Sequence, residues 1–169
     1  MEVNEVIIRE WLNLCRKQFT IADISFKVWG PKGGSNYSNV DIFAVDAKGK
    51  FFDYEVKWRS IYSLSATDRE KPGNLVRQMT RKEWVEAIQK IIGTRRYEKV
   101  LITTRVFFGK SEEKNQKMAK YFAKKEIDLV FFEDVIKELV DHINIKGRYN
   151  SPVLQTIRIL KMFSPFVAV

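Results

Sequence analysis

The 169-residue chain contains one cysteine, one histidine and only four prolines. A single cysteine, Cys15, excludes a framework of intrachain disulfides. Cys15 and His142 are also too few for a zinc site made of cysteine and histidine ligands, which takes about four of them. Any metal ion bound by this chain must therefore be held by oxygen atoms.

Long apolar runs are missing as well. No stretch of the sequence approaches the ~18 consecutive apolar residues that a membrane-spanning helix needs. Residues 1–5 carry acidic side chains where a secretory signal would carry basic ones. We therefore expect a cytoplasmic protein that has no membrane segment.

Apolar side chains and positive charge are both abundant. Hydrophobic residues make up 45% of the chain and aromatic residues 13%, which suffices for a packed core and excludes a disordered protein. The length fits one domain over residues 1–169, with 148–169 as a helical and apolar C-terminal extension. The chain has 30 Lys and Arg against 21 Asp and Glu, a net charge of +9, and this excess favours a polyanionic partner such as nucleic acid.

The hydrophobic pattern predicts an α/β protein. We expect helices over residues 3–19, 74–92, 111–125, 133–143 and 152–163, strands over 24–29, 40–45, 50–58, 100–104 and 128–132, and loops over 30–39 and 59–73. Thr80 and Glu83 form a capping-box pattern, which is typical of a second helix start within 74–92. The strands predict a central mixed β-sheet, an antiparallel meander followed by a parallel crossover, flanked by α-helices.

The hairpin over residues 40–58 predicts its own register. Its turn, Asp46-Ala47-Lys48-Gly49, suits a type I turn with Gly49 in the left-handed conformation, which closes a three-residue hairpin loop. Asp41 then faces Glu55, with their Cβ atoms roughly 4.5–5.5 Å apart. Lys57 lies two residues beyond Glu55 and projects from the same face.

Two carboxylates and one ammonium group would thus share a small patch. Like charges directly opposite each other destabilise a sheet, and a divalent cation between them removes this penalty. Mg²⁺ commonly takes one or two carboxylates together with water and phosphate oxygens, and an adjacent ammonium can position water or stabilise charge on phosphorus. The pattern favours phosphodiester hydrolysis. The alternative is a surface salt-bridge cluster, which the apolar neighbours Tyr54 and Val56 disfavour.

Asp41 is followed after thirteen residues by Glu55-Val56-Lys57, behind a helix and a strand and ahead of a helix. This order resembles the PD-(D/E)xK nuclease superfamily over residues 3–143, nearest to archaeal Holliday-junction-resolvase-like members. The resemblance implies a restriction-endonuclease-like core in which Asp41, Glu55 and the backbone carbonyl of Val56 bind Mg²⁺ or Mn²⁺. It also implies that Lys57 acts on the attacking water.

An acid from the first helix often completes the metal site in this family. Glu10, at the border of the apolar stripe of that helix, is our candidate, and Glu5 on the opposite border is the alternative. Asp53 lies nearer the turn and is expected to support the site or to be solvated. Several side chains near the hairpin or on the following helix are candidates to contact phosphates or substrate: Lys27, Lys32, Arg59, Arg77, Gln78, Arg81 and Lys82.

These features together predict a metal-dependent DNA endonuclease that acts on duplex or branched DNA, with Asp41, Glu55, Lys57 and Glu10 as catalytic residues. Cutting two strands is most simply arranged by a homodimer, and residues 162–169 are a candidate contact for it. Two alternatives stay open. One is a catalytically inactive nucleic-acid-binding module of the same fold, and the other is a nuclease directed at RNA.

Overall fold

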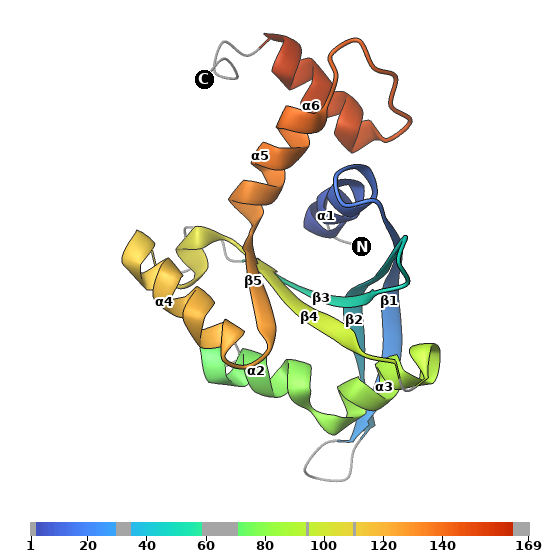
Figure 1. The fold of residues 1–169 in the computed structure, drawn as a ribbon, viewed down its shortest axis with the longest axis vertical. Helices are drawn as coiled ribbons and strands as arrows, with labels where there is room; N and C mark the ends of the chain where they lie inside the picture. Colours follow the sequence, from blue (N-terminus) through green and yellow to red (C-terminus); the bar gives the residue numbers. More distant parts are fainter. Residues whose placement is uncertain (1–2, 30–34, 59–70, 94, 110, 164–169) are drawn as a thin grey trace.

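A five-stranded mixed β-sheet with helices on both faces forms the centre of the protein (Figure 1). The computed structural model describes residues 3–29, 35–58, 71–93, 95–109 and 111–163. The strands lie in the order β1-β2-β3-β4-β5 and span Gln18–Trp29, Ser35–Asp46, Phe51–Lys57, Tyr97–Thr103 and Ile127–Phe131. β1, β2 and β3 pair antiparallel, whereas β4 and β5 continue the sheet in parallel. The predicted mixed sheet is confirmed.

Six α-helices and one 3₁₀ turn accompany the sheet. The helices are α1 (Val3–Leu14), α2 (Pro72–Thr80), α3 (Lys82–Ile92), α4 (Glu112–Ala123), α5 (Phe132–His142) and α6 (Pro152–Phe163), and the 3₁₀ turn is η2 (Arg105–Phe107). None of the described helices combines the length and the apolar character required to cross a bilayer.

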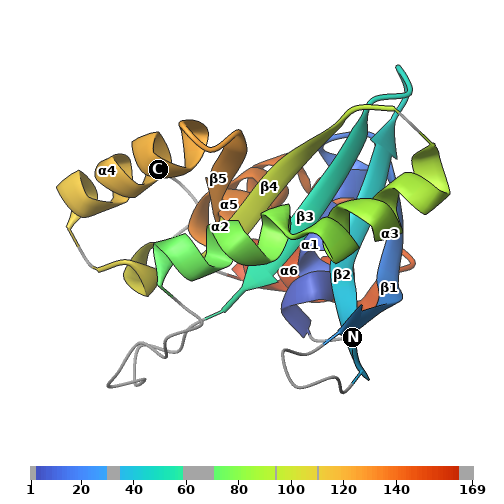
Figure 2. The same ribbon diagram turned by 90° about the horizontal axis from the view of Figure 1, so that it is seen from below.

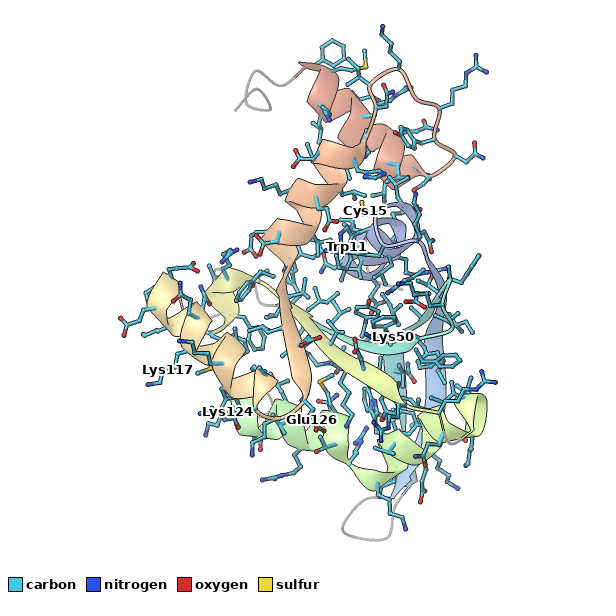
Figure 3. The ribbon with its side chains drawn as sticks, viewed as in Figure 1. Trp11, Cys15, Lys50, Lys117, Lys124 and Glu126 are labelled. Atoms are coloured by element: carbon cyan, nitrogen blue, oxygen red, sulfur yellow. The ribbon has the colours of Figure 1, made fainter. Side chains whose placement is uncertain are left out.

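The helices form two layers, one on each face of the sheet. α1, α5 and α6 pack on one face, where Trp11, Leu139 and Leu154 share a core with strand residues such as Ile42 and Tyr54. α2, α3 and α4 cover the opposite face (Figure 2). Figure 3 places Trp11 and Cys15 where α1 meets α5, and there the indole Nε1 of Trp11 donates to Glu138 at 2.9 Å.

The β2–β3 hairpin has the predicted register. Ile42 pairs with Tyr54, and Val45 with Phe51. Gly49 has φ +78° and its N–H donates to the carbonyl of Asp46, as the left-handed turn position requires. The Asp46 carboxylate accepts hydrogen bonds from the N–H groups of Lys48 and Lys50, which confirms it as a turn residue.

Two predicted boundaries around the first strand are wrong. The first helix ends at Leu14 rather than at residue 19, and β1 begins at Gln18 after a turn in which Lys17 has φ +55°. The loop predicted over residues 30–39 includes the start of β2, which begins at Ser35. Serine and asparagine favour loops by composition, but here pairing with β1 overrides that preference.

The stretch predicted as 74–92 is two helices, yet the capping box is not what divides them. Pro72 begins α2 at a position where a missing N–H costs nothing. The Thr80 hydroxyl donates to the carbonyl of Val76 instead of capping α3. Arg81, with ψ 148°, is the residue at which the first helix ends and the second begins.

The C-terminal residues 152–163 belong to the same core as α1 and α5. Leu154 is buried in that core, and Ile157 packs against it. The Lys161 ammonium donates to the carbonyls of Val140 and Ile143 at the end of α5, at 2.7 and 2.9 Å. Of the predicted contact segment 162–169, residues 164–169 lie outside the described residues.

Candidate active site

The candidate site lies where β2 and β3 separate. Their backbone ladder runs to the pair Ile42 and Tyr54, and Figure 2 shows the two strands diverging beyond it. Asp41, the next residue of β2, reaches across with its side chain: its Oδ2 accepts a hydrogen bond from the Val56 N–H at 2.8 Å. The carboxylate thus takes the place of a backbone carbonyl and is held in a fixed position.

The three predicted groups converge at this point. The Lys57 ammonium forms an ion pair with Glu55 Oε1 and lies 3.9 Å from Asp41 Oδ2. The Glu55 side chain is 1% exposed, that of Asp41 19% and that of Lys57 29%. A solvated salt-bridge cluster would leave its charged groups exposed to water. The low exposure of these side chains therefore argues against that alternative.

Gln78 on α2 orients the buried glutamate. Its Nε2 donates to Glu55 Oε1 at 2.8 Å, and the same oxygen is paired with Lys57. The other oxygen, Glu55 Oε2, is buried and has no hydrogen-bond partner among the described residues. Gln78 was predicted as a phosphate or substrate contact, whereas here it fixes a proposed metal ligand, with one glutamate oxygen left for a further partner.

A second buried carboxylate lies on the same strand face. Asp53 is 0% exposed, and its Oδ2 accepts a hydrogen bond from Trp84 Nε1 of α3 at 2.7 Å. Its Oδ1 has no partner among the described residues. A solvated Asp53 is therefore excluded. The sequence carries one signal for this pair, since a tryptophan in the buried stripe of a helix needs an acceptor for its N–H.

Burial perturbs the acid–base behaviour of these groups. It raises the pKa of Glu55 to about 8, with the charge of Asp41 adding to the effect and Lys57 opposing it. Burial also raises the pKa of Asp53 to about 7, although the hydrogen bond from Trp84 lowers it. Burial lowers the pKa of Lys57, but the charges of Glu55 and Asp41 outweigh this and raise it. Lys57 is therefore a cation at neutral pH.

The arrangement suits a hard divalent cation with an incomplete protein shell. Within the described ranges no group of three or more His, Cys, Asp and Glu side chains forms a metal cage. Mg²⁺ does not need one, because it keeps several waters and takes one or two carboxylates plus phosphate oxygens. Asp41 and the unpartnered oxygen of Glu55 fit this requirement. Val56 contributes its N–H to Asp41, and a role for its carbonyl stays a prediction.

Of the two acids on α1 that were considered for the site, Glu5 is the one whose charge reaches Lys57. Its negative charge contributes to the raised pKa of Lys57. Glu10 lies about 140° further around the helix, at ~100° per residue, and no hydrogen bond or ion pair joins it to another described residue. This charge effect favours Glu5 over Glu10, and the assignment of the helix acid stays a prediction.

The predicted phosphate contacts are only partly at the site. Arg81 is used for packing: it donates to Ser38 Oγ at 2.6 Å and its guanidinium lies over the rings of Phe26 and Trp84. Lys82 is exposed and pairs with Glu86 at 3.5 Å. Arg77 is exposed on α2, and Lys27 is exposed on β1. Lys32 and Arg59 lie outside the described residues.

The site therefore combines four side chains. Asp41 bridges β2 and β3 where they separate, and the buried Glu55 has one unpartnered oxygen. Lys57 is charged and pairs with Glu55, and the Gln78 amide orients Glu55. Groups of this kind can hold a cation, orient water and stabilise an anion.

Comparison of the chain with protein-family models, with curated proteins and with solved structures found no match.

Proposed function

We propose that this protein is a Mg²⁺- or Mn²⁺-dependent DNA endonuclease with a restriction-endonuclease-like core of the PD-(D/E)xK type. The observation that carries the proposal is the convergence of Asp41, Glu55 and Lys57 at the β2–β3 fork, with one oxygen of Glu55 buried and unpartnered. Burial and the charge of Asp41 raise the pKa of Glu55 to about 8, and a cation bound between the two carboxyls would favour the charged form of both.

The residues have distinct tasks in this proposal. Asp41 and Glu55 hold the metal ion, and Glu5 is the acid from the first helix. When bound, the divalent cation offsets negative charge on the phosphate and lowers the pKa of water. Lys57 orients the attacking water and stabilises charge on phosphorus as the P–O bond breaks. Gln78 keeps Glu55 in place through its 2.8 Å hydrogen bond.

Substrate and assembly follow from charge and symmetry. The net charge of +9 supports a polyanionic substrate, and the resemblance to Holliday-junction resolvases favours branched or duplex DNA. A homodimer would allow two strands to be cut by symmetry. The exposed apolar side chains of α6, including Leu160 and Phe163, are the surface that we assign to the dimer contact.

The test is cleavage of labelled linear duplex, single-stranded, four-way-junction and RNA substrates with Mg²⁺ or Mn²⁺. Asp41→Asn is the informative variant, because its amide oxygen can still accept the Val56 N–H while the charge is lost. Asp128→Asn, an exposed acid on β5, is the matched control.

Cutting by the wild type and the control, but not by Asp41→Asn, supports the proposal. Binding without cutting under either metal indicates an inactive binding module, and cutting of RNA alone indicates an RNA-directed nuclease. Cutting that survives Asp41→Asn places the active site elsewhere.

A further inference from the structure

The end of the sheet opposite the candidate active site carries an excess of positive charge. The site lies at the last residues of β3, whereas the first residue of β3 follows the turn from β2. Figure 2 shows this turn at the same end of the molecule as the start of β4 and the end of α3. Exposed cations lie in the turn, just before β1 and just before β4, and we call them the basic end: Lys17, Lys48, Arg95 and Arg96.

The acids at this end of the sheet are already engaged. The Asp46 carboxylate accepts hydrogen bonds from the N–H groups of Lys48 and Lys50 in the turn. Glu98 forms an ion pair with Lys50. Across the described part of the chain, no ion pair joins a cation of the basic end to an acid. The basic end can therefore neutralise phosphates and release counterions from a nucleic acid.

A row of apolar side chains crosses the sheet beside the basic end. Its members are direct neighbours on β1, β2, β3 and β4 and therefore share one face of the sheet: Phe19, Val45, Phe51 and Tyr97. Ile92 at the end of α3 belongs to the core against which Phe51 and Tyr97 pack. The helix thus covers the β3 and β4 part of the row but not its β1 end, where Phe19 is 75% exposed.

Two flat groups on this face are exposed. One is the ring of Phe19. The other is the guanidinium of Arg95, an exposed residue whose Cζ lies 5.6 Å from the centroid of the Phe51 ring. Phe19 and Phe51 lie on either side of β2, so they are about 10 Å apart at ~4.8 Å between strands.

We propose that the basic end, together with Phe19, binds single-stranded nucleic acid. Bases stack on the Phe19 ring and on the Arg95 guanidinium, because every base has a flat π-face and both groups are stacking partners for bases. Phosphates next to the stacked bases pair with the remaining cations of the basic end: Lys17, Lys48 and Arg96.

The flat groups and the charges together select this ligand. In a duplex, neighbouring base pairs cover the faces of the bases, so a duplex can use only the cations. An acidic peptide would pair its carboxylates with the cations and needs no stacking platform. Single-stranded nucleic acid is the ligand that uses both kinds of group.

This surface is separate from the candidate active site. Phe51 and Glu55 are four residues apart on β3, about 13 Å at ~3.3 Å per residue. The buried Asp53, bonded to Trp84 of α3, lies between them on the strand. The inference therefore goes beyond the proposed nuclease function and does not depend on it.

The experiment measures binding in EDTA by fluorescence anisotropy, so that metal-dependent cleavage does not enter the readout. The probes are a fluorescein-labelled oligothymidine, which forms no duplex, and a labelled DNA duplex. Phe19→Ala removes one stacking platform, and its matched control is Tyr37→Ala on β2, an aromatic residue that is 77% exposed. Arg95→Lys removes the other platform but keeps the charge. Thermal melting verifies that all variants fold.

A second pair of variants tests the phosphate contacts. Lys48→Ala/Arg96→Ala removes two cations of the basic end. Lys117→Ala/Lys120→Ala removes the same charge from exposed positions of α4, where Figure 3 shows Lys117. Comparing the two at several salt concentrations separates a local contact from an effect of net charge.

We expect Phe19→Ala and Arg95→Lys each to bind oligothymidine roughly tenfold more weakly than the wild type, and to bind the duplex as the wild type does. Lys48→Ala/Arg96→Ala should reduce the salt-dependence slope for oligothymidine by about 1.4, at ~0.7 for each phosphate contact. Tyr37→Ala and the α4 variant should stay close to the wild type. Equal affinities of Phe19→Ala and the wild type for oligothymidine, or equal slopes for the two charge variants, would overturn the inference.

Failure of this inference differs from failure of the proposed nuclease function. A protein that cleaves no substrate but binds oligothymidine through Phe19 leaves the inference standing. Affinity for oligothymidine that falls with Asp41→Asn and not with Phe19→Ala would place the strand at the candidate active site and overturn the inference.

Discussion

Replacing Glu55 with glutamine should stabilise the metal-free protein in alkaline solution, although it removes a proposed metal ligand. Burial raises the pKa of this carboxyl from 4.5 to about 8, so folding takes up a proton between these pH values. The free energy of unfolding therefore falls as pH rises through this range, by about 1.4 kcal/mol per pH unit. Above pH 8 the accumulated loss is on the order of 5 kcal/mol.

Glutamine resembles the protonated glutamate. Its amide oxygen can accept from Gln78 and Lys57 as Glu55 Oε1 does, and its nitrogen takes the place of the unpartnered Oε2. Near pH 4.5 the two proteins should be similarly stable, and the difference should grow with pH. Asp53 adds a slope of the same sign to both proteins, because its pKa is raised to about 7. Its charge also raises the pKa of Glu55, so the wild type loses additional stability at the pH values where both carboxyls ionise.

The assay is urea unfolding followed by tryptophan fluorescence in EDTA at several pH values. Glu98→Gln is the control, since that glutamate is 43% exposed and pairs with Lys50 at the surface. We expect a Glu55→Gln advantage of several kcal/mol at pH 8.5 and little at pH 4.5. Parallel curves for Glu55→Gln and the wild type across this range would refute the argument that burial keeps this carboxyl protonated.

Three further predictions concern single contacts. Trp84→Phe leaves both oxygens of Asp53 without a partner and should cost about 2 kcal/mol in urea unfolding; it should also raise the pKa of Asp53 further, and an unchanged midpoint would contradict this. Gly49→Ala meets open space but must adopt φ +78°, so a loss of about 1 kcal/mol is expected in thermal melting, and a stabilised variant would show that the turn relaxes. Glu5→Gln should slow Mg²⁺-dependent cleavage more than Glu10→Gln does, because of these two acids only Glu5 affects the pKa of Lys57. A larger effect of Glu10→Gln would indicate that Glu10 is the acid that completes the site.

The hairpin register could be predicted from the sequence because its determinants are local. Strand alternation and the Asp46–Gly49 turn define which residues face each other, and Asp41, Glu55 and Lys57 converge as a result. The loop predicted over residues 30–39 shows the limit of composition, since Ser35 and its neighbours become a strand through pairing with β1.

Features set by the docking of helices could not be predicted. The hydrogen bonds from Gln78 to Glu55 and from Trp84 to Asp53 depend on how α2 and α3 cross the sheet. The choice between Glu5 and Glu10 depends on the rotation of α1, and both border the same apolar stripe. Sequence periodicity gives the buried side of a helix but not its orientation on the sheet to within one residue.

The position of β3 between an antiparallel and a parallel neighbour has a consequence for the order of folding. Asp41 lies on β2, which is joined to β3 by a short turn. On the other side of β3, Leu101 of β4 lies beside Glu55, and β4 is reached only through a long crossover connection. Contacts between such distant segments form slowly, because a large loop must close first. We expect the acidic pair to meet early in a water-filled hairpin, and to be sealed from solvent only in the last stage of folding. In a nascent chain Asp41 and Glu55 would then meet in water, and Glu55 would become buried only after β4 has been synthesised.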